Sequence, residues 1–174
     1  TSKIVVNHFK ELAKLIIERY LKLSNSFVIE LGSNDGSFLK NFSELNIDHL
    51  GIEPAAAVAE SGIKEGVNTI TDFFSQELAR KVKARYGLAD VIFGANVIAH
   101  IPDIRSVAKG IIELLKDDGV FIFEAVYLGD LINNTSYSQI YDEHVYNFSV
   151  ESVKNTFGEY GLELFDVERV PMQG

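Results

Sequence analysis

Apolar and polar positions along the chain follow two spacings, the repeat of an amphipathic helix and the short apolar run of a buried strand. The helical repeat places Ile4, Leu12 and Ile16 on one face of the first segment, and Phe27 begins the first apolar run. Helices are predicted at residues 3–23, 35–45, 55–64, 75–85, 103–115 and 149–160. Strands are predicted at residues 27–31, 49–52, 67–70, 89–93, 120–124 and 162–170.

Residues at the ends of these segments support the assignment. Pro54 favours a helix start, Ser75 and Ser149 are predicted N-caps, and Gly161 follows the last helix. Because strands alternate with helices, the sequence predicts an α/β fold, with a mostly parallel twisted sheet and helices on both faces. No Pro/Gly/Ser-rich linker interrupts the pattern, so residues 1–174 are expected to form one domain.

The clearest chemical signal is the turn after the first strand, where Glu30 is followed by Gly32, Asn34 and Gly36. Ligands of parallel sheets bind at the carboxyl ends of the strands, and glycines let the backbone approach them closely. Glu53 ends the second strand, where a carboxylate can accept hydrogen bonds from both hydroxyls of a ribose. This arrangement indicates a cofactor that contains adenosine.

The spacing of the glycines discriminates between two such cofactors. The dinucleotide pattern G-x-G-x-x-G fails at Asn34 and Ser37, whereas Glu30, Gly32 and Gly36 resemble the methyltransferase pattern of an acidic residue and then G-x-G-x-G. A carboxylate suits a cationic sulfonium and an ammonium, and it would repel a pyrophosphate. The turn therefore favours S-adenosylmethionine over a nicotinamide cofactor. A plain glycine turn with incidental carboxylates is the simpler alternative.

Two further strand ends carry candidate residues, and each has two interpretations. Asp72 and Phe73 can contact the adenine of a cofactor, or Asp72 can begin a helix while Phe73 and Phe74 lie in the core. Asn96 follows the fourth strand and is expected to face the cofactor. His100 can serve the site or be a structural turn residue.

Composition and charge restrict the class of protein. The chain is 47% hydrophobic and 24% charged, has no cysteine, and carries a formal net charge of −9. Thiolate metal sites and disulfides are excluded, no metal site is predicted, and a nucleic-acid partner is disfavoured. No apolar run is long enough for a transmembrane helix, and no secretory leader is visible, so a cytoplasmic protein without a membrane partner is expected.

One longer motif, Tyr141-Asp142-Glu143-His144-Val145-Tyr146-Asn147-Phe148-Ser149, makes the resemblance specific. Through this motif, the chain resembles the central part of bacterial sugar C-methyltransferases, which methylate nucleotide-linked keto-deoxysugars. The other matching stretches are residues 29–37, 50–55, 72–74, 95–100 and 120–131. The resemblance implies a Rossmann-like class I methyltransferase core, S-adenosylmethionine as cofactor and a sugar nucleotide as the small-molecule substrate.

The resemblance also implies roles for single residues. The catalytic cluster would be Tyr141, Glu143 and His144, with His144 as the base. Together with the turn described above, the predicted cofactor-binding residues are Glu30, Gly32, Ser33, Asn34, Gly36, Glu53, Pro54, Asp72, Phe73, Asn96 and Val97.

The chemistry of the catalytic cluster can be argued from the residues alone. Methylating a carbon next to a ketone requires an enolate, and the ordinary pKa of histidine, about 6.5, suits His144 to the removal of that proton. Glu143 or Asp142 can orient the imidazole, and Tyr141 can donate to the enolate oxygen. A structural histidine ahead of the helix at Ser149 is the alternative for His144.

The chain departs from the family pattern in several ways. Asp142 stands where relatives often have histidine, and the cysteine-rich zinc module and the large C-terminal domain of the relatives have no counterpart here. We therefore expect a fragment of a larger protein. The final strand of a class I sheet would follow residues 171–174 and is expected to be missing, which would leave an open edge beside the last strand.

Three other functions remain as alternatives to sugar C-methylation. The first is an O- or N-methyltransferase acting on another small molecule, since a hydroxyl substrate requires the same base. The second is a nicotinamide-dependent oxidoreductase, against which the missing glycines and Glu30 argue. The third is a non-catalytic cofactor-binding fragment.

Overall fold

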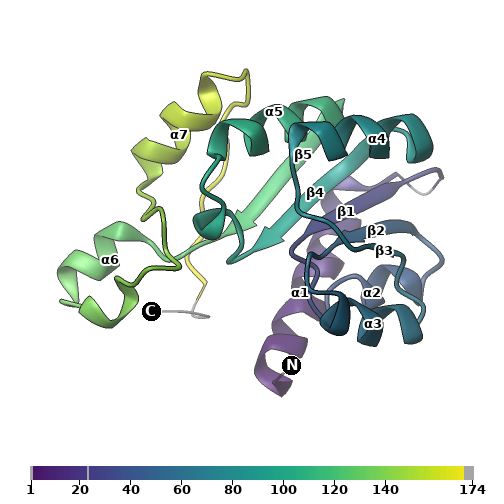
Figure 1. Cartoon of the computed structure of the whole chain (residues 1–174), viewed down its shortest axis with the longest axis horizontal. Helices are drawn as coiled ribbons and strands as arrows, with labels where there is room; N and C mark the ends of the chain where they lie inside the picture. The colour runs from purple at the N-terminus through teal and green to yellow at the C-terminus, as the bar shows by residue number, and fades with distance from the viewer. Residues whose placement is uncertain (1, 23, 171–174) are drawn as a thin grey trace.

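The computed structural model describes residues 2–22 and 24–170 and contains a five-stranded sheet in which every neighbouring pair is parallel (Figure 1). The strand order is β3-β2-β1-β4-β5. The strands are β1 (Phe27–Leu31), β2 (Asp48–Ile52), β3 (Thr69–Ile70), β4 (Ala89–Ala95) and β5 (Leu115–Glu124). The predicted α/β fold with a parallel sheet is therefore confirmed.

Helices cover both faces of the sheet, with α1, α2 and α3 on one side and α4 and α5 on the other (Figure 1). The helices of the first face are α1 (Lys3–Tyr20), α2 (Lys40–Ser43) and α3 (Ala56–Lys64). The remaining helices are α4 (Gln76–Tyr86), the 3-10 turn η1 (Ile98–His100), α5 (Ile104–Leu114), α6 (Leu128–Asn133), the 3-10 turn η2 (Tyr137–Gln139) and α7 (Val150–Gly158). No helix in these described ranges has the length and hydrophobicity to span a bilayer.

Each central strand divides its side chains between two apolar cores. Val28 and Phe93 face α1 and α2, where they are buried with Ile16 and Phe42. Ile29, the next residue of β1, lies in the opposite core beneath α4 and α5. Because a strand buried on both faces carries apolar residues at consecutive positions, the central strands read as continuous apolar runs in the sequence.

A partly buried ion pair connects the strand ends that lie opposite the glycine turn. Asp90 is 7% exposed, and its Oδ2 accepts hydrogen bonds from the Phe27 backbone N–H at 2.8 Å and from Lys116 Nζ at 2.7 Å. The pair connects β1, β4 and β5. It therefore sets how the three strands align with one another.

Local hydrogen bonds explain where the main helices begin. Ser75 accepts a hydrogen bond from the Leu78 N–H, and Ser149 forms a capping box with Ser152, which confirms both predicted N-caps. Asp103 caps α5 in the same way. The first helix ends at Tyr20, and residue 23, which the prediction included, lies outside the described residues.

The helix predicted at residues 35–45 is largely wrong, because only α2 forms there. The Asp35 carboxylate accepts hydrogen bonds from both the backbone N–H and the hydroxyl of Ser37. Gly36 has a φ of +77°. Side-chain acceptors and left-handed backbone both compete with helical hydrogen bonding, so the segment begins as a series of turns.

The strand predicted at residues 162–170 is also wrong, since this segment has no regular secondary structure. Leu162 at its start packs against the core, but Phe165 and Val167 are 64% and 59% exposed. Alternating polarity favours a strand only where a neighbouring strand supplies hydrogen bonds. Among the described residues, β5 is the edge of the sheet, and a groove of about 530 Å³ separates it from this segment. The expected open edge is therefore at β5.

We predict that Asp90→Ala lowers the free energy of unfolding by about 2–4 kcal/mol, because it leaves the Phe27 N–H and the Lys116 ammonium without their buried acceptor. Urea denaturation measures the effect. The control is Glu60→Ala, which breaks an exposed pair with Lys64 and should change the free energy by less than about 0.5 kcal/mol. Equal effects of the two substitutions would contradict this interpretation.

Candidate active site

The turn after β1 is shaped by close packing of the chain upon itself. Gly32 has a φ of +67°, and a Cβ at this position would lie 2.8 Å from Val97 Cγ2. Gly36, at φ +77°, would place a Cβ 3.0 Å from Val67 Cγ2. Asn34 also adopts a positive φ, +49°. The glycines at 32 and 36 are thus required by the backbone and its neighbours, and asparagine tolerates the position between them.

Glu53 lies at the carboxyl end of β2 and supports this turn. Its Oε2 accepts from the Asn34 N–H at 3.0 Å, and its Oε1 accepts from the Ala55 N–H at 2.9 Å. The side chain is 8% exposed. Each carboxylate oxygen has a second lone pair, so Glu53 can still accept hydrogen bonds from two ribose hydroxyls. The adjacent Pro54 is exposed.

Glu30 and Ser33 are buried beside the turn without hydrogen-bond partners. Glu30 is 3% exposed and Ser33 is 2% exposed, and neither Glu30 Oε2 nor Ser33 Oγ has a partner. Burial raises the pKa of the Glu30 carboxyl well above its usual range, and the nearby charges of Asp35 and Glu53 raise it further. Orphaned polar atoms at a glycine turn fit a polar ligand that bears a positive charge.

The third strand end places one aromatic ring on the surface and one in the core. Phe73 is 76% exposed, and its backbone N–H donates to Asp72 Oδ1 at 2.8 Å. Phe74 is 8% exposed and belongs to the core on the α4 and α5 face. Only Phe73 is therefore free to cover the face of a ligand, and the alternative of a core residue holds for Phe74.

Asn96 and Val97 connect the glycine turn to a second cluster of polar residues. Asn96 has a φ of +53°, and its N–H donates to the Glu124 carbonyl at 2.9 Å. The Glu124 carboxylate contacts His8 Nε2 of α1 at 2.5 Å. Val97 approaches Gly32, while Asn96 lines a pocket that contains His144. The turn after β4 therefore borders both halves of the site.

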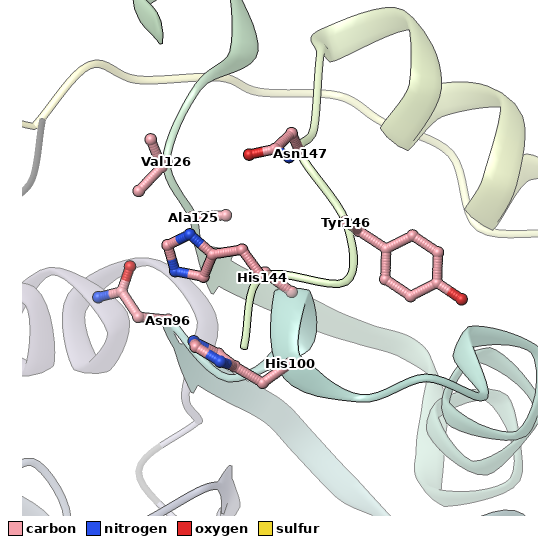
Figure 2. Close-up of a pocket in the computed structure, with 8 residues that line it drawn as sticks. Asn96, His100, Ala125, Val126, His144, Tyr146 and Asn147 are labelled. Atoms are coloured by element: carbon pink, nitrogen blue, oxygen red, sulfur yellow. The ribbon is translucent and has the colours of Figure 1, made fainter. Parts of the chain in front are cut away.

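His144 lies at the centre of that pocket (Figure 2). Its Nδ1 is 2.6 Å from the Gln139 carbonyl oxygen, and its Nε2 is 3.1 Å from the Tyr141 hydroxyl. A carbonyl can only accept, so in the neutral imidazole Nδ1 carries the proton and Nε2 accepts from Tyr141. The His100 ring is 4.9 Å from the His144 ring, centroid to centroid. Asn96 lines the same pocket as these two histidines (Figure 2).

The loop that carries His144 is attached to two other parts of the site. The Tyr146 N–H donates to the Ala99 carbonyl at 3.2 Å, and the Tyr146 hydroxyl donates to the Pro102 carbonyl. Further along, the Leu128 N–H donates to the Phe148 carbonyl at 2.7 Å. These bonds hold the loop against η1 and against the chain that follows β5.

The structure thus brings together only part of the predicted catalytic cluster. Tyr141 and His144 are in contact, but the Glu143 and Asp142 side chains are exposed and neither forms a hydrogen bond or ion pair with His144 among the described residues. The orienting group is the Gln139 carbonyl, which the sequence analysis missed because a backbone acceptor has no residue-type signal. His100, whose role the sequence left open, lines the same pocket as His144. The described residues contain no cluster of three or more potential metal ligands.

Comparisons with known proteins identify the family of this chain. Residues 6–167 match the family model described as a methyltransferase domain, and the chain belongs to the S-adenosylmethionine-dependent methyltransferases. The chain is 34% identical over 170 residues to the C-methyltransferase NovU of Streptomyces niveus, covering 98% of this chain and 40% of that protein. It thus spans less than half the length of this curated relative.

Solved structures share the fold at low sequence identity. A putative O-methyltransferase from Nostoc punctiforme has a TM-score of 0.72 at 18% identity, covering 98% of this chain and 54% of that one. A possible histamine N-methyltransferase from Thermotoga maritima has a TM-score of 0.61 at 21% identity, covering 92% and 74%. The plantazolicin methyltransferase BpumL, solved with S-adenosylhomocysteine, has a TM-score of 0.62 at 10% identity, covering 87% and 61%. The cofactor of this family is S-adenosylmethionine.

We predict that Gly32→Ala destabilises the protein by about 1–3 kcal/mol, because the new Cβ meets Val97 and a non-glycine residue is strained at this φ. Thermal or urea unfolding measures the loss. Gly158→Ala is the control, since this residue is helical and a methyl group added there would meet nothing within 4 Å. The double variant Gly32→Ala/Val97→Ala should recover only the part of the lost stability that comes from the contact with Val97, and not the part that comes from backbone strain.

We also predict that Glu30→Gln stabilises the ligand-free protein at neutral pH. The folded-state pKa of Glu30 lies above the unfolded one, so folding takes up a proton, and stability is lost as pH rises between the two values. Glutamine cannot ionise, so the stability difference between variant and parent should grow across that interval. Urea denaturation at a series of pH values measures it. A stability difference between variant and parent that does not change with pH would contradict a raised pKa of Glu30.

Proposed function

We propose that the protein transfers a methyl group from S-adenosylmethionine to a carbon next to a ketone in a nucleotide-linked deoxysugar. The observation that carries this proposal is the Tyr141–His144 pair, in which the Gln139 carbonyl lies on Nδ1 and leaves Nε2 as the acceptor of the neutral ring. The 34% identity to a C-methyltransferase supports it. A putative O-methyltransferase and a possible histamine N-methyltransferase share the fold at lower identity.

The residues around the glycine turn fit the donor. In this proposal the Glu53 carboxylate accepts from the ribose hydroxyls, Asp72 accepts from the adenine amino group and Phe73 covers the base. Glu30 faces the cationic methionyl end. The remaining lining comes from Gly32, Ser33, Asn34, Gly36, Pro54, Asn96 and Val97. When bound, the donor supplies an electrophilic methyl group.

The catalytic step in the proposal is proton removal by His144. The Gln139 carbonyl keeps the proton on Nδ1, so the Nε2 lone pair is the basic site. When a substrate ketone lies beside Tyr141, the Tyr141 hydroxyl can turn from His144 Nε2 to the ketone oxygen. That movement frees Nε2 to accept the proton from the adjacent carbon and places a donor on the developing enolate. Glu143 remains a candidate for the residue whose negative charge stabilises the imidazolium of His144.

We also propose that residues 1–174 are one donor-binding domain of a larger, cytoplasmic protein with the sugar nucleotide as its small-molecule partner. An O- or N-methyltransferase is the alternative function, because the same histidine can deprotonate a hydroxyl. A non-catalytic cofactor-binding role is the remaining alternative.

The proposed function is tested by solvent exchange on keto-deoxysugar nucleotides in D₂O, with S-adenosylhomocysteine present and followed by NMR. We expect deuterium to replace the hydrogen on the carbon beside the ketone. His144→Asn should reduce this exchange by at least about 100-fold, and Tyr141→Phe by less, since it removes the enolate donor but leaves the base. Val145→Ala, an exposed change in the same loop, is the control.

The position of the transferred methyl group separates the alternatives. With donor labelled at the methyl carbon, a new carbon–carbon bond supports the proposal. A label on oxygen or nitrogen, with no hydrogen exchange, would favour the alternative enzymes. Full turnover by His144→Asn would remove this residue from the mechanism.

A further inference from the structure

Two glutamates at the glycine turn have opposite environments although both are buried. Glu53 accepts a backbone N–H on each oxygen, and these donors stabilise its negative charge. Glu30 is buried more deeply, and its Oε2 has no hydrogen-bond partner. Ser33 Oγ, close by in the chain, is likewise buried without a partner. Only Glu30 thus lacks compensation for a charge.

The groups packed around Glu30 offer no positive charge. Its register neighbours are Gly51 on β2 and Phe93 on β4, and neither is charged. The charges that act on Glu30 come from Asp35 and Glu53, and both are acidic.

The helices that cover this face do not supply a cation either. His8 of α1 is paired with Glu124, and Lys40 of α2 is paired with Glu65. The other charged side chains of α1 are exposed: Lys3, Lys10, Glu11, Lys14, Glu18 and Arg19. No ion pair to Glu30 occurs within residues 2–22 and 24–170.

An ionised carboxylate in this position would be destabilised by burial and by two like charges. Protonation removes that cost, and burial accordingly raises the pKa of Glu30 well above its usual range. A cation that enters the pocket reverses the balance, because it supplies the missing charge at short range.

We propose that Glu30 couples donor binding to proton release: it is a neutral carboxylic acid in the ligand-free protein and gives its proton to solvent when the cationic methionyl end of S-adenosylmethionine enters the pocket. The carboxylate then forms an ion pair with the ligand, and one proton appears in the buffer for each donor bound. This inference depends on donor binding and is independent of the acceptor.

The proposal has a consequence for exchange of donor and product. The donor has a sulfonium and an ammonium, whereas the product keeps the ammonium but has a neutral sulfur. If the sulfonium is the partner of Glu30, methyl transfer removes the charge that holds the carboxylate ionised. Glu30 then takes a proton back, and the product loses its ion pair with the pocket.

Titration calorimetry in two buffers of different ionisation enthalpy tests the coupling, because released protons contribute the heat of the buffer. We expect close to one proton released per S-adenosylmethionine below the pH at which Glu30 ionises in the free protein. Over the same interval, the Kd should fall by about tenfold per pH unit and become constant above it. A difference infrared spectrum should also lose a protonated carboxylic acid band when the donor binds.

Glu30→Gln is the decisive variant, since it keeps the shape but cannot ionise. We expect it to release no proton and to give a Kd that does not change with pH over this interval. Asp48→Asn, an exposed change at the other end of β2, is the matched control and should behave as the parent. If Glu30→Gln fails to fold, the buffer dependence and infrared spectrum of the unsubstituted protein decide the question.

A comparison with S-adenosylhomocysteine, which lacks the sulfonium, identifies which cation of the donor pairs with Glu30. Proton release with the donor alone assigns the sulfonium, and release with both ligands assigns the ammonium; either result supports the coupling. Donor binding with no proton release and a constant Kd overturns the coupling and leaves the proposed function intact. Absence of donor binding would overturn both. Full proton release by Glu30→Gln would assign the proton to another group.

Discussion

The structure depends on the close approach between the turns that follow β1 and β4. Val97 packs so closely on Gly32 that no side chain fits there. Asn96, the residue before Val97, lines the pocket of His144. One packing contact therefore positions the glycine turn relative to the pocket of His144. The parallel register makes this possible, because it brings the carboxyl ends of β1 and β4 to the same edge of the sheet.

Features that are local in the sequence could be predicted. The central strands were evident as apolar runs, and Ser75 and Ser149 were correctly assigned as N-caps because their partners lie three residues away. The glycine turn and the pairing of Tyr141 with His144 are also short-range. These features depend on spacing along the chain, which the sequence states directly.

Features that depend on distant partners could not be predicted. The alternation at residues 162–170 suggested a strand, but whether a neighbouring strand is present is not a property of that segment. Glu30 and Glu53 are the same residue type at two strand ends, and only the folded structure gives Glu53 two backbone donors and leaves Glu30 Oε2 without a partner. The carbonyl of Gln139 could not have been singled out, since every residue has one.

The attachment of the His144 loop has a dynamic consequence. Two backbone hydrogen bonds, from Tyr146 to Ala99 and from Leu128 to Phe148, hold the end of this loop to η1 and to the chain after β5. A segment secured in this way is poorly suited to swing as a lid during each turnover. A movement of residues 146–148 away from the His144 pocket would have to break these backbone hydrogen bonds.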